Sequence, residues 1–116
     1  MKSPGSRLLQ YRDRSIAVDA EGYLQNLDEW DEEVAAALAE SEEIRLREAH
    51  WEVIFAVRGF YQQHQLSPPM RPLVRLVKRE LGEDKGRSVY LMKLFGGSAA
   101  KTVNKIAGLP RPANCL

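Results

Sequence analysis

Cysteine is almost absent from this chain: Cys115, the penultimate residue, is the only one among 116. A lone cysteine cannot close an internal disulfide, which excludes a disulfide-stabilised secreted scaffold and favours a reducing compartment. Long apolar runs are lacking too, because no stretch approaches the roughly 20 residues that cross a bilayer, and the N-terminus has no apolar core of a signal peptide. We therefore expect a cytoplasmic protein with no membrane segment.

Motifs that bind nucleotides or activate nucleophiles are also missing, since there is no glycine-rich phosphate loop and no nucleotide fingerprint. The two histidines, His50 and His64, lie 14 residues apart, and neither has a cysteine or another histidine at ligand spacing. We therefore expect no metal site and no cofactor, and we interpret His50, beside Trp51, as a structural residue.

The chain has almost no net charge, +1 from 17 basic and 16 acidic side chains. No overall field therefore favours nucleic acid. The charges are nevertheless segregated: residues 28–43 hold eight of the acidic side chains and no basic one, whereas Lys and Arg prevail from Arg71 onward. This asymmetry predicts one acidic and one basic surface, each a candidate docking surface.

Two short β-prone runs, 8–11 and 15–18, flank Arg12-Asp13-Arg14 and predict a hairpin with a three-residue turn. All later patterns are helical, and Ser98 is expected to cap the last helix. Helices are predicted over 31–41, about 47–65, 70–81, 88–95 and from 98 through 106. The expected fold is mainly α, of the α+β kind, in a single domain over 1–116 with a flexible N-terminus at 1–7.

The helix predicted over 47–65 has a wide apolar face, typical of a central core helix. Arg58 interrupts that face, and we expect its aliphatic stem to be buried while its charge reaches a partner or water. The large aromatic side chains are expected to anchor the core and not to stack on bases: Trp30, Trp51, Phe55, Phe60 and Phe95.

The C-terminal residues leave the helical pattern, because Gly108 is followed by Pro110 and Pro112. Proline fixes φ and biases the residue before it toward extended conformations. We predict a semi-stiff, mobile arm over 108–116 that swings at Gly108 and carries the thiol of Cys115 at its tip. The alternative is an incidental thiol on a frayed chain end.

Short motifs in a fixed order run along nearly the whole chain. They are Asp19–Leu24, His50–Val53, Phe60-Tyr61 ahead of Ser67-Pro68, Arg71, Leu81-Gly82, Lys85-Gly86, Tyr90-Leu91, Leu94-Phe95 and Lys105–Cys115. Each is weak alone, but their order, with the KIAGLP stretch and a penultimate cysteine, resembles the DsrC/TusE family of sulfur-carrier proteins. The resemblance implies that Cys115 carries sulfur as a persulfide, loaded and unloaded by thiol exchange.

Position 104 separates two branches of that family. The DsrC branch has a second cysteine just before the KIAGLP stretch, where this chain has Asn104, so the disulfide and trisulfide chemistry of that branch is removed. The pattern is similar to the one-cysteine TusE branch. That branch implies that Cys115 accepts a persulfide from a TusBCD-type complex and passes it to a tRNA 2-thiouridylase for 2-thiolation of the wobble uridine. It also implies a sulfurtransferase-type relay and not a stand-alone catalyst, with direct tRNA contact left open.

Four cationic side chains are candidates to steady a persulfide anion or to hold the arm: Arg71, Lys101, Lys105 and Arg111. Arg111 lies close to Cys115 in sequence and favours its thiolate, while the terminal carboxylate of Leu116 opposes it. For each of the others, taken singly, a solvated surface charge is the simpler explanation.

Two further interpretations remain open. One is a DsrC-like carrier that serves sulfur oxidation or another acceptor. The other is a DNA-binding regulator, because residues 70–95 resemble a helix-turn-helix whose second helix carries Arg87, Ser88, Tyr90 and Lys93. The short turn is equally typical of any small helical domain, and the neutral overall charge argues against DNA. A regulator would show salt-dependent DNA affinity that survives Cys115→Ser.

Overall fold

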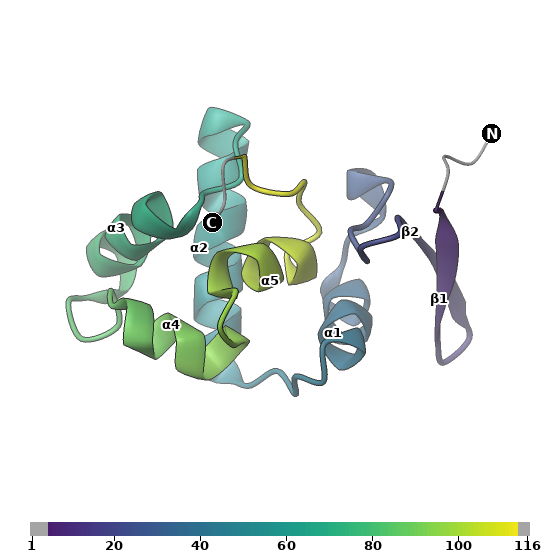
Figure 1. Ribbon diagram of the computed structural model, residues 1–116, viewed down its shortest axis with the longest axis horizontal. Coiled ribbons are helices and arrows are strands. Elements are labelled where there is room, and N and C mark those ends of the chain that lie inside the picture. The colour runs from purple at the N-terminus through teal and green to yellow at the C-terminus, as the bar shows by residue number, and fades with distance from the viewer. Residues whose placement is uncertain (1–4, 114–116) are drawn as a thin grey trace.

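The computed structural model describes residues 5–113, in which a two-stranded hairpin precedes a group of α-helices (Figure 1). The elements are β1 (Arg7–Tyr11), β2 (Arg14–Val18), the 3₁₀ helix η1 (Leu27–Glu29), α1 (Glu32–Ser41), α2 (Glu48–His64), α3 (Met70–Leu81), α4 (Ser88–Phe95) and α5 (Ala99–Ile106). The expected mainly helical α+β fold is confirmed, and each helix lies where the periodicity predicted it.

The hairpin has a tighter turn than expected. Strands β1 and β2 pair antiparallel, with Tyr11 opposite Arg14, so the turn holds two residues and the predicted three-residue turn is wrong. Arg14 joins the ladder because Arg12 adopts a φ of +53°, the left-handed conformation that short hairpin turns use. Ile16 and Val18 of β2 are buried and tie the hairpin to the core.

Helix α2 is the central element, with α1 and the hairpin on one side and α3 and α4 on the other (Figure 1). Its residues Val53, Ile54 and Val57 are fully buried. Phe55 is not a core anchor, contrary to expectation, because it lies off this stripe and its side chain is 48% exposed. Its ring stacks on Trp51, with centroids 5.8 Å apart, and so covers the outside of α2.

Helices α3, α4 and α5 complete the core, and His50 links α4 to α2. The ring Nδ1 of His50 accepts a hydrogen bond from the backbone N–H of Arg47 (3.0 Å), and Nε2 donates to the carbonyl of Leu94 (2.9 Å). The structural role expected for His50 is confirmed. Ser98 occupies the N-cap position of α5 but makes no side-chain capping bond there, so that part of the prediction is wrong.

The predictions of one domain and of mobility at 1–7 and 108–116 stay predictions. Within those ranges the structure describes residues 5–7 and 108–113, and Arg7 already belongs to β1. Gly108, Leu109 and Pro112 are buried.

Candidate functional site

The segment that leads toward Cys115 doubles back after α5 and runs to the end of α2, as the yellow trace in Figure 1 shows. The backbone N–H of Leu109 donates to the carbonyl of Asn104 (3.0 Å), and the hydroxyl of Ser67 donates to the carbonyl of Pro110 (2.6 Å). Leu109 is buried at 3% exposure. Residues 108–112 are therefore held by both backbone bonds and packing. Cys115 itself lies outside the described residues.

The reversal of the chain depends on Gly108. Its φ of +75° is a conformation that costs a side-chain-bearing residue roughly 1–2 kcal/mol. A Cβ at this position would also overlap with the indole of Trp30. That indole donates from Nε1 to the carbonyl of Ile106, at 2.9 Å. Trp30 thus fixes both the end of α5 and the direction in which the chain leaves it.

Arg58 holds the next carbonyl. Its guanidinium donates to the carbonyl of Ala107 at 2.6 Å and lies over the Trp30 ring, 3.8 Å from the ring centroid. A guanidinium over an indole is attracted by the ring quadrupole. Burial lowers the pKa of Arg58 below its usual value, yet an arginine remains charged at neutral pH. The expected partner of Arg58 is therefore a backbone carbonyl at the base of the C-terminal segment, reached across Trp30.

Asn104 lies at the position where the resemblance to the DsrC branch implies a second cysteine. It is fully buried, and its amide nitrogen donates to the carbonyls of Pro68 (3.0 Å) and Ala100 (2.8 Å). Its Oδ1 has no hydrogen-bond partner among the described residues. The amide therefore ties α5 to the α2–α3 connection, the same connection that holds Pro110 through Ser67.

Two of the four candidate cations come together beside Tyr23. Lys105 Nζ lies 2.9 Å from a carboxylate oxygen of Glu42 and 5.2 Å from the Tyr23 ring centroid. Arg111 forms an ion pair with Glu21, and its guanidinium lies 5.8 Å from the same centroid. Both cations thus fasten the C-terminal part of the chain to the region that follows the hairpin.

The other two candidates, Arg71 and Lys101, do not join this group. Both are exposed, and neither forms an ion pair with any residue in 5–113. Lys101 lines a hollow of about 220 Å³ together with Met70. Their part in sulfur chemistry stays a prediction.

Hollows flank the described end of the C-terminal segment. One, of about 350 Å³, is lined by Tyr61, Leu66, Pro69, Pro110 and Ala113, among others. Another, of about 390 Å³, lies on the other side of Pro110 and Arg111 and includes Tyr23 and Leu27. The segment thus lies exposed between two concave surfaces at 110–111.

Trp30 and Ser67 were not predicted from the sequence to position the C-terminal segment. A partial signal was present for Arg58, the one charge on an apolar helix face. The sequence holds no such signal for Trp30 and Ser67, because their hydrogen-bond partners lie 76 and 43 residues away along the chain.

The residues expected to read DNA lie on and next to α4. Arg87, Ser88 and Lys93 are exposed and Tyr90 is half-buried, with α3 and α4 joined across a glycine turn at 82–86. DNA binding by this pair of helices stays a prediction.

Within residues 5–113, no group of three or more His, Cys, Asp or Glu side chains is placed to hold a metal ion. In the same range no helix combines the length and apolarity needed to span a membrane.

Solved structures share this architecture. The solution structure of Allochromatium vinosum DsrC has a TM-score of 0.85 and 38% identity, with 96% of this chain and 99% of that chain covered. The oxidized γ-subunit of dissimilatory sulfite reductase from Archaeoglobus fulgidus, also DsrC, has a TM-score of 0.81 and 36% identity over 95% of this chain and all of the other. The hairpin, the helices around α2 and the returning C-terminal segment thus define a protein of the DsrC/TusE class of sulfur-relay proteins.

Sequence comparisons agree with this class. The family model for DsrC-like proteins matches residues 10–116. The sulfurtransferase TusE of Pectobacterium atrosepticum is 49% identical over 94% of this chain and all of its own length, and that of Yersinia pestis is 48% identical over the same shares. The chain belongs to the DsrC family, and its relatives include the TusE sulfurtransferases.

Proposed function

We propose that the protein is a sulfur carrier that accepts a persulfide on Cys115 and passes it to a tRNA 2-thiouridylase for 2-thiolation of the wobble uridine. The donor would be a TusBCD-type complex, and a cytoplasmic location fits a function that requires a reduced thiol. The relatives named sulfurtransferase TusE support the sulfur-transfer part of this function. Asn104 in place of a second cysteine supports the one-cysteine relay.

The transfer is a thiol exchange. The thiolate of Cys115 attacks the outer sulfur of a donor persulfide, a new S–S bond forms, and the donor's inner sulfur leaves as a thiolate with the electron pair of the broken bond. A second exchange with the thiolate of the acceptor restores the Cys115 thiolate. Neither step needs a net oxidant or reductant.

The observation that carries this proposal is the anchoring of the chain just before Cys115. Gly108, Trp30 and Arg58 set its direction, and Ser67 holds Pro110. Since Cys115 is three positions after Pro112 and each residue spans at most about 3.6 Å, the Cα of Cys115 can lie at most roughly 11 Å from that of Pro112. An anchored base lowers the entropic cost of presenting the thiol to a partner.

Intact-protein mass spectrometry tests the carrier role, after incubation with a cysteine desulfurase, cysteine and the TusBCD-type complex. We expect a gain of one sulfur atom that is lost on reduction and absent in Cys115→Ser. We also expect Cys115→Ser to keep the wild-type melting temperature, because the thiol is not expected to belong to the core. No gain from a competent donor would refute the relay.

The acceptor is tested separately with the loaded protein, a tRNA 2-thiouridylase and unmodified tRNA, by measuring 2-thiouridine in the digested tRNA. Formation of 2-thiouridine that requires Cys115 supports the tRNA branch. Loading of Cys115 without 2-thiouridine would direct the sulfur to another acceptor, as in the DsrC branch.

A further inference from the structure

The described end of the C-terminal segment lies beside the start of α3, because Ala113 and Pro69 line the same hollow. Cys115 is two positions after Ala113, so the Cα atoms of the two residues lie at most about 7 Å apart. Any protein that exchanges sulfur with Cys115 must therefore cover the surface around the first turn of α3.

That surface contains a hollow of about 220 Å³ between the starts of α3 and α5 and helix α4, with both apolar and polar side chains in its walls. Its walls include Met70, Met92 and Ala99. The volume is several times the ~30 Å³ that one water occupies in the liquid, so an apolar side chain can enter. Methionines suit such a site because their unbranched side chains adapt to the shape of a partner.

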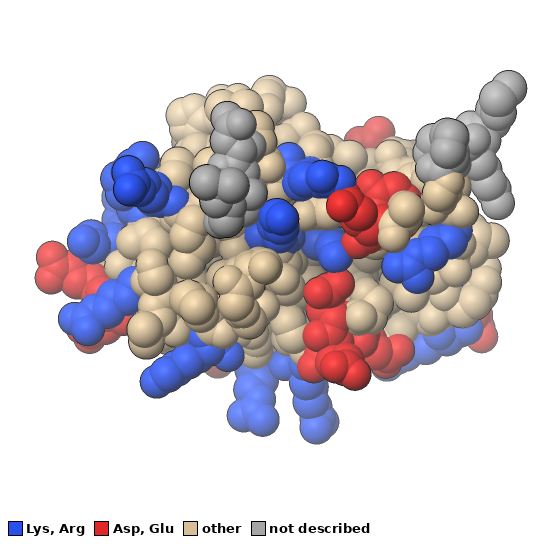
Figure 2. Space-filling model, in the orientation of Figure 1, with Lys and Arg blue, Asp and Glu red and all other residues tan. Residues whose placement is uncertain are grey.

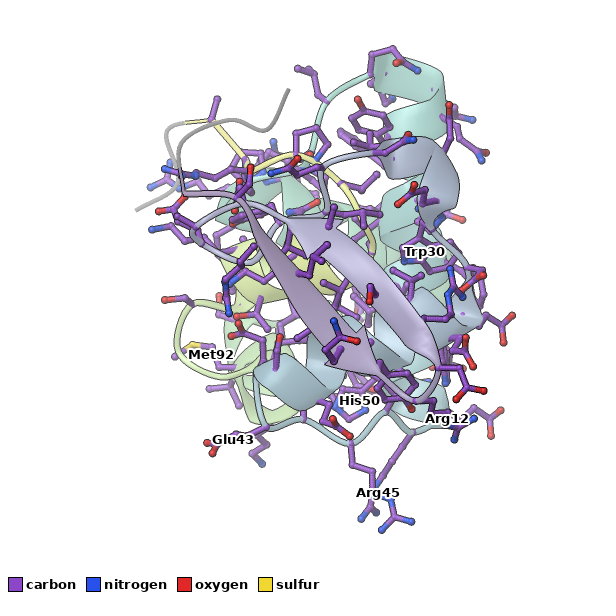
Figure 3. The ribbon with its side chains drawn as sticks, turned by 90° about the vertical axis from the view of Figure 1, so that its right-hand side faces the viewer. Arg12, Trp30, Glu43, Arg45, His50 and Met92 are labelled. Atoms are coloured by element: carbon purple, nitrogen blue, oxygen red, sulfur yellow. The ribbon has the colours of Figure 1, made fainter. Side chains whose placement is uncertain are left out.

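The hollow continues onto an exposed apolar face of α4. Val89 is 64% exposed and Met92 is 43% exposed, and their i, i+3 spacing places them on one side of the helix. Figure 3 shows Met92 at the outer edge of the molecule. Exposed apolar side chains next to a hollow are typical of a protein-docking surface.

The rim of this surface is cationic. Arg71, Lys93 and Lys101 are exposed, and none of them forms an ion pair within residues 5–113, whereas Lys85 and Lys105 are paired. Residues 70–106 contain nine Lys or Arg and only three Asp or Glu. Figure 2 shows blue side chains bordering an uncharged tan area over α4 and α5, while red side chains gather over α1.

We propose that the hollow between Met70 and Met92, with its rim of Arg71, Lys93 and Lys101, is the docking surface for an acidic segment of the protein that exchanges sulfur with Cys115. The segment places an apolar side chain in the hollow and its carboxylates on the rim. A protein is favoured over RNA because a phosphate backbone has no apolar group to fill the hollow. This inference rests on the proposed sulfur relay.

Charge reversal tests the surface. The double variant Arg71→Glu/Lys101→Glu should slow loading from the TusBCD-type complex, or discharge to the tRNA 2-thiouridylase, by roughly tenfold or more, because oppositely charged surfaces steer encounter and like charges repel. Loading by free cysteine persulfide, which needs no docking, should slow by a much smaller factor than the protein-dependent step. Met92→Asp should slow the same protein-dependent step by removing the apolar contact.

A matched control is Arg45→Glu/Lys78→Glu, which changes the net charge equally. Both residues are exposed and without an ion pair in 5–113, and Lys78 lies seven residues, about 10 Å, along α3 from Arg71. The control should stay within about twofold of wild type. Circular dichroism melts of all variants show whether each one is folded.

The possible failures are distinguishable. If the wild type is loaded neither by the donor complex nor by cysteine persulfide, the relay itself fails. If the wild type is loaded but Arg71→Glu/Lys101→Glu matches it in both protein-dependent steps, the docking surface is refuted and the relay stands. If the double variant loses only affinity for free tRNA, or only a self-association seen by sedimentation, the surface belongs to RNA or to a second copy and the proposal is overturned.

Discussion

Trp30 shows how much of the C-terminal geometry one side chain determines. Its Nε1 binds the carbonyl of Ile106, its face carries the guanidinium of Arg58, and its edge meets Gly108. The indole can do all three because it combines a large apolar surface with one polar N–H. The base of the C-terminal segment therefore rests on a residue that precedes α1.

Gly108→Ala should destabilise the fold by about 2 kcal/mol or more, because the methyl group meets both an unfavourable φ and the Trp30 indole. Urea denaturation measures this change. The control is Gly59→Ala in the interior of α2, where an added Cβ has nothing within 4 Å; that variant should gain about 0.5–1 kcal/mol. Equal effects of the two substitutions would show that residues 107–109 are not packed as described.

His50 should make stability depend on pH. Burial lowers the pKa of His50 from its usual 6.5, the bond to the Leu94 carbonyl opposes this shift, and the charge of Arg47 adds to it. Because the unfolded chain binds the proton more readily, stability is complete above pH ~6.5 and is lost as the pH falls through that value toward the folded-state pKa. Protonation of Nδ1 also removes the acceptor for the Arg47 N–H.

Melting temperatures between pH 8 and 5.5 check this expectation. The wild type and His64→Gln should fall together as the pH is lowered, since His64 is exposed. His50→Gln should change less over the same interval. A His50 pKa at or above 6.5 in an NMR titration would contradict the argument.

At the scale of elements, α1 depends on the carboxylate at its N-cap, Asp31. Asp31 Oδ1 accepts from the backbone N–H of Val34 (2.8 Å), and Oδ2 lies 2.9 Å from Arg14 of β2. The bond from Val34 lowers the pKa of Asp31 most, partial burial opposes it, and Arg14 lowers it further. One carboxylate thus starts the helix and fastens it to the hairpin.

Asp31→Ala should cost about 1 kcal/mol of unfolding free energy, because the helix loses its N-cap. Asp31→Asn keeps an acceptor for the Val34 N–H and loses only the exposed ion pair, so its cost should be at most ~1 kcal/mol and smaller than that of alanine. Urea denaturation of the three proteins gives the comparison. If Asp31→Asn costs as much as Asp31→Ala, the ion pair and not the cap stabilises this junction.

For the whole molecule, the C-terminal segment joins parts that are distant in sequence. Arg58 of α2, Trp30 ahead of α1 and Ser67 of the α2–α3 connection all bind backbone carbonyls between Ile106 and Pro110. The charges are arranged at the same scale, with α1 acidic and α3 basic. Two surfaces of opposite charge on one small relay protein are suited to two different partners.

Arg58→Met should lower stability by about 2 kcal/mol, because the buried Ala107 carbonyl loses its donor and Trp30 loses its cation. It should also slow sulfur loading from the donor complex, since the base of the segment is no longer fixed. Chemical denaturation and the mass-spectrometric loading assay measure the two effects. Arg75→Met, at an exposed position on α3 without an ion pair in 5–113, is the control and should stay within about 0.5 kcal/mol of wild type.

The sequence by itself determined the local structure. Helix periodicity, the prolines after α2 and the glycines after α3 and α4 define where each helix begins and ends, because these signals act through neighbouring residues. The order of short motifs and the penultimate cysteine likewise pointed to the DsrC family without any structure.

Only the tertiary structure decided which residues hold the C-terminal segment and which cations remain unpaired. The bond from Trp30 to Ile106 joins residues 76 positions apart, and no sequence period records such a contact. The exposure of Phe55 has the same origin, since an apolar residue at the edge of a helix face is buried only if another element covers it. Within residues 5–113, Lys105 and Arg111 pair with carboxylates while Arg71 and Lys101 do not, because pairing depends on which surfaces the fold brings together.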